Sequence, residues 1–309
     1  MKLDSVRELK REAARVAAEV FEPALAFGDE MEALTIPKGW VGLGISPAEV
    51  GEYKLAVRLQ RRDERTAELV DALRELAVNE IDIRYVGPVV AASGVAALKP
   101  KSNSSPPLYI GCSIAHHKVA AGTLGAFVRP RGDAKNTYVL SNNHVLALEN
   151  RAKALDAIVR PCPSDGGTSA DRVAGMSRFV PLGQSNEVDC AIACIDAHVA
   201  YEPHTIPFLG RLRGILQTES PPGLKVAKYG KNGLSRGTVT AFEVDIDVRY
   251  ALGTLRFENQ LEIEGEGDQP FASNGDSGSL VVAPDLMALG MVFAVTPEGG
   301  WNTKGLTYA

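Results

Sequence analysis

The sequence lacks several features that mark secreted, membrane-spanning or disulfide-rich proteins. Only four of its 309 residues are cysteines (Cys112, Cys162, Cys190 and Cys194), which is too few for a disulfide scaffold. It has no run of about 18 apolar residues that would predict a transmembrane helix. Its charged N-terminus lacks the apolar stretch of a secretory signal. We therefore expect reduced thiols, a cytoplasmic location and no membrane partner.

A large excess of one charge is absent too. Lys and Arg number 33 and Asp and Glu number 38, so the formal net charge is −5 at pH 7. A mildly acidic chain argues against a nucleic-acid partner. The cysteines and histidines lack the paired spacing that holds zinc, so we expect no metal and no cofactor. The hydrophobic share of 45% and charged share of 23% are ordinary for a globular chain, and the length suggests about two domains.

Residues 3–21 predict an amphipathic helix, because apolar side chains recur there with helical spacing opposite Lys and Glu. Two roles are open for this helix. It could pack on its own domain, or it could dock to a regulatory protein partner or to a second copy of the chain in a homo-oligomer.

A small α/β module follows this helix. Segments 41–46, 53–60 and 81–87 are strand-like, and segment 66–78 has the apolar spacing of a helix. Strands and a helix within so short a stretch are typical of a small mixed sheet. No catalytic constellation falls in this module, so we expect residues 1–95 to have a regulatory, structural or partner-binding role.

The chain changes character after this module. Residues 91–107 are rich in Ala, Ser, Pro and Gly, which is linker composition. We place the linker at residues 96–110 and a second domain at 111–309. In that domain, short apolar runs alternate with turn signals, which is typical of a β-sandwich or β-barrel. The runs are 122–128, 136–141, 157–161, 172–180, 188–195, 224–230, 237–250, 254–263, 278–283 and 288–295.

Three residues of the β-rich part are candidates for catalysis. His144 follows a predicted strand end, and histidine can take and return a proton near neutral pH. Asp189 begins an apolar strand, where a buried carboxylate needs a partner such as a histidine N–H. Ser277 lies in a Gly-Asp-Ser-Gly turn before another apolar strand. Taken alone, each also fits a structural role: a core histidine, a strand-entry carboxylate and an ordinary hairpin turn.

The glycines around Ser277 add to its catalytic interpretation. Glycine at position 275 allows the backbone to direct two N–H groups, those of Gly275 and Ser277, at one point. Such a pair is an oxyanion hole. Gly278 leaves room for a substrate backbone beside the nucleophile.

The order His144, Asp189, Ser277 is that of the chymotrypsin class. Residues 122–295 resemble trypsin-like, chymotrypsin-fold serine proteases. With the segments AGTLGA, SNNHVLA and GDSGSLV, the chain looks most similar to bacterial relatives of the plant narrow-leaf protease family. The resemblance implies an α+β fold, in which an N-terminal helix and small α/β module precede a double antiparallel β-barrel with the active site between the barrels.

The chain departs from that pattern in two places. Ser279 stands where the wider protease class has glycine, and the chain ends at Ala309 without a closing helix. We therefore expect either a shortened form or self-cleavage near this end. No signal for activation of a zymogen is visible, so control of activity is expected from the N-terminal module or a partner.

The resemblance implies a serine endopeptidase of restricted specificity that acts on proteins or peptides. The alternatives are an inactive protease-fold protein that binds peptides or serves as a scaffold, and an esterase. The absence of acidic residues from the expected first specificity pocket favours a small or medium apolar side chain in the substrate. The expected pocket residues are Phe271, Val292, Phe293, Ala294 and Val295.

Overall fold

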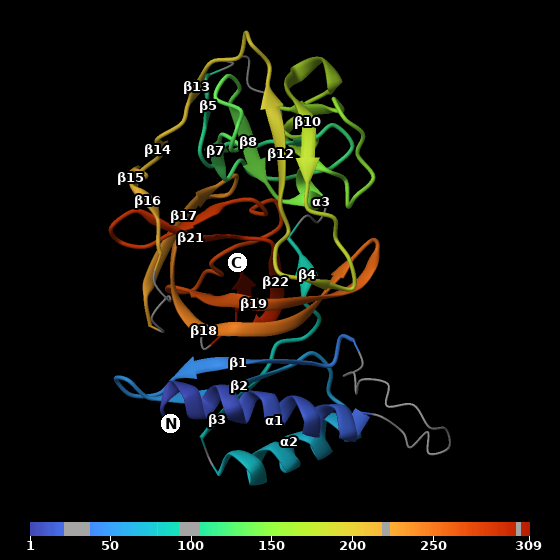
Figure 1. Ribbon diagram of the computed structural model, residues 1–309, viewed down its shortest axis with the longest axis vertical. Coiled ribbons are helices and arrows are strands. Elements are labelled where there is room, and N and C mark those ends of the chain that lie inside the picture. Colours follow the sequence, from blue (N-terminus) through green and yellow to red (C-terminus); the bar gives the residue numbers. More distant parts are fainter. Residues whose placement is uncertain (22–37, 79, 93–105, 218–222, 301–303) are drawn as a thin grey trace.

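A computed structural model describes residues 1–21, 38–78, 80–92, 106–217, 223–300 and 304–309, and shows a helix-covered sheet beside a β-rich body (Figure 1). In chain order the α-helices, 3-10 helices (η) and strands are α1 (Leu3–Phe21), β1 (Val41–Pro47), β2 (Tyr53–Leu59), α2 (Glu64–Ala77), β3 (Ile81–Tyr85), β4 (Val90–Ala91), β5 (Leu108–Tyr109), β6 (Ala115–His116), β7 (Ala126–Val128), β8 (Tyr138–Ser141), α3 (Asn143–Leu146), β9 (Ala157–Val159), η1 (Pro163–Asp165), η2 (Ser169–Asp171), β10 (Arg172–Phe179), β11 (Ser185–Asn186), β12 (Ala191–Ile195), β13 (Tyr201–Glu202), β14 (Thr205–Ile206), β15 (Gly210–Arg211), β16 (Gly214–Ile215), β17 (Lys225–Gly230), β18 (Gly233–Tyr250), β19 (Gly253–Gly265), β20 (Leu280–Val282), β21 (Met287–Met291), β22 (Ala294–Gly299) and β23 (Gly305–Tyr308).

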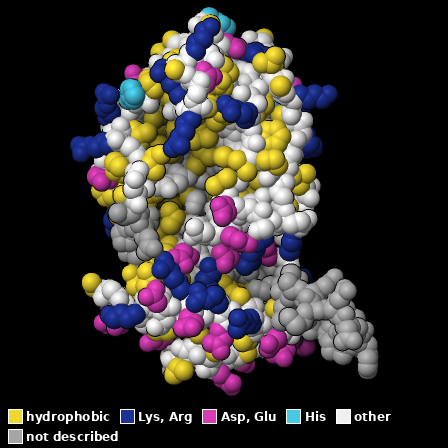
Figure 2. All heavy atoms as spheres, in the orientation of Figure 1, with side chains coloured by type: hydrophobic (Ala, Val, Ile, Leu, Met, Phe, Trp, Pro, Cys, Tyr) yellow, Lys and Arg dark blue, Asp and Glu magenta, His cyan; other side chains and the backbone are white. Residues whose placement is uncertain are grey.

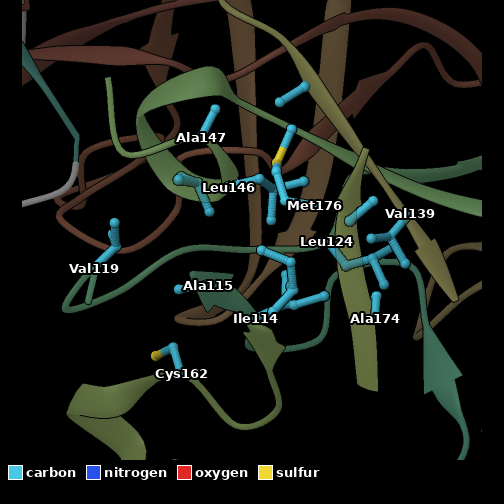
Figure 3. Close-up of a cluster of buried hydrophobic side chains, with 14 of the residues drawn as sticks. Ile114, Ala115, Val119, Leu124, Val139, Leu146, Ala147, Cys162, Ala174 and Met176 are labelled. Atoms are coloured by element: carbon cyan, nitrogen blue, oxygen red, sulfur yellow. The ribbon is translucent and has the colours of Figure 1, made fainter. Parts of the chain in front are cut away.

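The first half of the β-rich body is a ring of antiparallel strands. Its six-stranded sheet has the order β6-β9-β10-β12-β8-β7, and a bridge between Ser113 and Thr123 joins the segments that lead into β6 and β7. Apolar side chains fill the interior of this ring, including Ile114, Val139 and Met176 (Figure 3). The strand-like apolar runs of the sequence therefore close into a barrel around one core.

A second ring follows in the chain. β17 pairs with β18, β18 with β19, β19 with β23, and β23 with β22. β21 and β22 act as one strand interrupted at Val292 and Phe293, and β20 pairs with both β21 and β17 to close the ring. Numbered along the chain, both rings have the order 1-2-3-6-5-4. This architecture confirms the expected α+β class with a double antiparallel β-barrel.

The N-terminal module is a sheet covered by two helices. β1 pairs antiparallel with β2, and β2 pairs parallel with β3. Helices α1 and α2 pack on this sheet through a shared apolar cluster that includes Leu9, Phe21, Leu43 and Leu69. The apolar face of α1 is therefore buried in its own module, as in the first of the two roles open for it. No helix of the described residues is long and apolar enough to cross a membrane.

The module is joined to the second barrel by a shared sheet and by buried charge. β1 pairs antiparallel with the long strand β18, which also belongs to the barrel (Figure 1). Arg58 of β2 is fully buried and bonds the Glu262 carboxylate of β19 through Nε and Nη2, at 2.6 and 2.8 Å. Outside these joints the module is highly charged. Figure 2 shows Lys, Arg, Asp and Glu side chains mixed over its surface.

The segment that leaves the module begins with a strand, although its composition is typical of a linker. Val90–Ala91 form strand β4, which pairs antiparallel with β22 and parallel with β18. Ala92 follows this strand, donates its N–H to the Phe293 carbonyl at 3.0 Å and is fully buried. The expected linker at residues 96–110 lies mostly outside the described residues, which resume at residue 106.

Candidate active site

His144 and Asp189 meet because they flank two paired strands. His144 lies in α3 just after β8, and Asp189 lies just before β12, which pairs with β8 through Ala191 and Ser141. The His144 Nδ1 atom lies 2.5 Å from the Asp189 Oδ2 atom, and both side chains are buried. The backbone N–H of Asn143 also donates to Asp189 Oδ1, at 2.6 Å. The carboxylate is thus fixed by several donors and fixes the imidazole in turn.

A tyrosine completes the surroundings of this carboxylate. The Tyr250 hydroxyl donates to Asp189 Oδ2 at 2.8 Å, and the Tyr250 ring packs edge-on against the His144 ring. Burial, and then the negative charge of Asp189, raise the pKa of Tyr250 well above its ordinary value. The hydroxyl therefore remains protonated and serves as a donor. Tyr250 stands at the end of β18, so this contact links the second barrel to the first.

Ser277 lies in the turn between β19 and β20, against the first barrel. The Thr123 N–H donates to the Ser277 carbonyl at 2.8 Å, and the Thr123 hydroxyl donates to the Gly275 carbonyl at 2.8 Å. At Gly278, which has φ of +92°, an added Cβ would lie 2.1 Å from both Ser141 Oγ and the Thr123 carbonyl oxygen. Glycine is therefore required where the nucleophile turn packs on the histidine-bearing barrel.

The expected His144–Ser277 hydrogen bond is not formed in this structure. His144 Nε2 and Ser277 Oγ are both buried, and neither has a hydrogen-bond partner among the described residues. Buried polar side-chain atoms normally have a partner, and catalytic hydrogen bonds often tighten only when substrate binds. The structure thus assembles the His–Asp half of the expected triad and leaves the two reactive atoms buried without a hydrogen-bond partner among the described residues.

The turn before Ser277 holds an N–H group that is bonded to a peptide carbonyl. Gly275 has φ of +98°, and its N–H donates to the Ala92 carbonyl oxygen at 2.7 Å. Asp276 anchors the turn: its Oδ1 atom lies 3.0 Å from Lys228 Nζ, and both side chains are only 2% exposed. Its Oδ2 atom accepts the Ser273 N–H. A buried ion pair within the chain therefore sets the shape of the expected oxyanion hole.

The expected pocket residues are buried in the second barrel. Phe271, Val292 and Val295 belong to one apolar cluster that also contains Ala92. Phe293 and Ala294 belong to the neighbouring cluster that contains Tyr308 and Phe257. The structure brings the first set around Ala92, while Phe293 and Ala294 contribute backbone to the strand that pairs with β4.

Three residues that support the site, Lys228, Lys231 and Tyr250, were not among the candidates predicted from the sequence. Lys228 pairs with Asp276, and Lys231 Nζ lies 2.9 Å from Asp165 Oδ1. Lys228 lies two residues after Val226 in β17 and so on the same face of the strand, and this period-two position was a signal for its burial. Tyr250 had no such signal, because its partner lies in the other barrel.

No family model matches the chain, and no curated protein matches it. Similar solved structures include Thermobifida fusca protease A (19% identity, 64% of this chain and 89% of that one, TM-score 0.43). Cellulomonas bogoriensis chymotrypsin is 18% identical over 66% of this chain and 90% of its own, with TM-score 0.42, and Nocardiopsis protease is 15% identical over 66% and 91%, with TM-score 0.43. These structural neighbours are bacterial serine proteases, and at such low identities and TM-scores the likeness does not extend to activity or specificity. The expected kinship with the narrow-leaf family stays a prediction.

Proposed function

We propose that this chain is a serine endopeptidase that acts through His144, Asp189 and Ser277. Ser277 Oγ attacks the carbonyl carbon of the substrate while His144 Nε2 takes the hydroxyl proton. Asp189 holds the imidazole through Nδ1 and stabilises the imidazolium that forms. The Gly275 N–H, together with that of Ser277, stabilises the oxyanion, a contribution of about 3–4 kcal/mol per donor in comparable sites.

The second half of the reaction uses the same residues. The carbon–nitrogen bond breaks as His144 returns the proton to the leaving amine, and an ester remains on Ser277. Water then attacks this ester and gives a proton to His144, which returns it to Ser277 Oγ. One water is consumed, and the products are a carboxylic acid and an amine, which are present as carboxylate and ammonium near neutral pH.

One observation carries this proposal. Two buried reactive atoms, His144 Nε2 and Ser277 Oγ, have no partner among the described residues, while the neighbouring Gly275 N–H is bonded to a peptide carbonyl. A purely structural His–Asp pair would not require a backbone N–H in the serine-bearing turn that donates to a peptide carbonyl. Phe271 and Ala92 lie in one buried apolar cluster, which supports a preference for a small apolar side chain before the cleaved bond.

A fluorophosphonate, which reacts with activated serines, tests the proposal. We expect mass mapping to find the label on Ser277 and to find none in Ser277→Ala or His144→Ala. His116→Ala is the matched control, because His116 is also fully buried and its Nε2 atom lies 3.3 Å from a carboxylate, that of Asp156. Labelling of His144→Ala at the rate of His116→Ala would contradict the proposed role of His144.

A further inference from the structure

Residues 89–92, which lead out of the N-terminal module, lie where a substrate of the proposed enzyme would bind. Ala92 accepts the Gly275 N–H at its carbonyl oxygen, 2.7 Å away, and donates its own N–H to the Phe293 carbonyl at 3.0 Å. Donors 2.7–3.1 Å from the oxygen are the geometry that stabilises an oxyanion. Gly275 is two residues from Ser277 in the same turn, so the Ala92 carbonyl is hydrogen-bonded to the turn that carries the proposed nucleophile.

The residues before Ala92 are held as a substrate strand would be. Ala91 pairs with Ala294 and Val90 with Val295, antiparallel to β22. On the opposite side, the Arg249 N–H of β18 donates to the Val89 carbonyl at 2.9 Å. An extended peptide that adds to a sheet in this way gains affinity from main-chain hydrogen bonds and specificity from pockets for alternate side chains.

The side chains of this segment enter two apolar clusters, with Val89 and Ala91 at one and Ala92 in the other. Ala92 is fully buried in the cluster that contains Phe271 and Val292. Val90 is 36% exposed, and Val89 is fully buried in the neighbouring apolar cluster. Because Ala92 is buried in the same cluster as Phe271 and Val292, we expect a small apolar side chain to be favoured at position 92.

We propose that Val89–Ala92 is the first substrate of this enzyme, and that the enzyme hydrolyses its own peptide bond after Ala92. This inference rests on the proposed function. Ser277 forms an ester with the Ala92 carbonyl carbon, the amine of the next residue leaves with the proton from His144, and water releases the Ala92 carboxylate. Until the strand leaves the cleft, it excludes other substrates, so the N-terminal module controls access to the site.

We expect the two fragments to stay associated after the cut. The module remains attached to the second barrel through the β1–β18 pairing and the Arg58–Glu262 bonds after the cut. Cleavage must therefore be measured under denaturing conditions. We expect wild-type protein to yield two fragments, residues 1–92 and 93–309, by intact mass and N-terminal sequencing, and Ser277→Ala to remain whole.

Variants of the strand test its recognition. Ala92→Glu should slow the cut by about 100-fold or more, because an unpaired carboxylate would enter an apolar pocket. Val50→Glu is the control, since Val50 lies fully exposed between β1 and β2 of the same module and outside the proposed substrate strand, and it should be cut at the wild-type rate. Ser277→Ala mixed with active wild-type protein should stay whole, because the proposed cut is intramolecular.

Hydrolysis of the anilide of acetyl-Val-Val-Ala-Ala separates the two proposals. Wild-type protein that stays whole while it hydrolyses this anilide or accepts the fluorophosphonate would overturn self-cleavage and leave the peptidase function standing. Wild-type protein that stays whole and unlabelled while Ala92→Glu is labelled would show an inhibitory strand that is not cut, which also overturns the proposal. Absence of label and hydrolysis in both proteins, each folded, would overturn the peptidase function itself.

Discussion

Tyr250 and Tyr308 both donate a hydrogen bond to a buried carboxylate, but only Tyr250 contacts the candidate site. It donates to Asp189 and packs on His144, so it fixes the orientation of the residue pair that must accept the serine proton. Among the described residues, the Tyr250 hydroxyl is hydrogen-bonded to Asp189 and not to Ser277 or Ala92. Tyr250 is therefore a positioning residue.

Tyr250→Phe should therefore lower kcat/KM for peptide hydrolysis by about 10-fold, which corresponds to loss of one hydrogen bond to a charged group. The matched control is Tyr308→Phe, because the Tyr308 hydroxyl is also buried and donates to a carboxylate, that of Glu262, at 3.1 Å. We expect both variants to unfold at a lower temperature, and only Tyr250→Phe to lose activity. Equal kcat/KM values for the two variants would argue against the positioning role.

At the scale of one element, β17 shows how a strand supports the oxyanion turn. Val226, Lys228 and Gly230 point to the inside of the barrel, while Lys225 points outward and is exposed. The inward lysine compensates the buried carboxylate of Asp276. The positive charge that pairs with Asp276 comes from a lysine side chain. The shape of the turn therefore does not depend on a free amino group created by cleavage of the chain.

Lys228→Met should lower the free energy of unfolding by about 3–5 kcal/mol, because it leaves the Asp276 carboxylate buried without its ion-pair partner. We also expect slower fluorophosphonate labelling, since the Gly275 N–H moves with the turn. Lys225→Met on the same strand should change stability by less than about 0.5 kcal/mol. Denaturant unfolding of the two variants measures the difference, and similar curves would exclude a supporting role for the buried pair.

At the scale of the whole molecule, a buried ionic cluster fastens the module to the barrel. Burial alone would raise the pKa of Glu262, but the Arg58 guanidinium outweighs this effect and lowers it. The pKa of Asp82 is lowered in the same way, with burial opposed by Arg58 and Arg84. Groups with a depressed folded-state pKa stabilise the fold above their unfolded pKa, about 3.9 for Asp and 4.3 for Glu.

This stability is lost as the pH falls through the folded-state pKa values. The melting temperature of wild-type protein should therefore decrease between about pH 5 and pH 3. Glu262→Gln should melt at a lower temperature at pH 6 and should show a shallower decrease with acid. Glu243→Gln is a partly exposed control, because its 2.5 Å pair with Arg7 lies at the edge of the same joint. Parallel melting curves for Glu262→Gln and wild type would contradict this account.

Most of the local structure followed from the sequence, because periodicity is a short-range property. The helix predicted at 3–21 matches α1, and the strand predicted at 81–87 contains β3. The residue types and order of His144, Asp189 and Ser277 also indicated the chemistry, since a base, its orienting carboxylate and a nucleophile beside glycine can be identified without coordinates. Of these, only the His144–Asp189 contact is formed in the structure.

Only the tertiary structure decided where each of these pieces meets the others. Ala92 falls in a stretch of linker-like composition at the end of the predicted module, and only the pairing of β4 with β22 and β18 brings it to Gly275. The contacts of Tyr250 with Asp189 and of Arg58 with Glu262 join residues far apart in the chain. Local patterns carry no record of such partners, because the free energy of a long-range contact depends on which distant surface the fold brings to it.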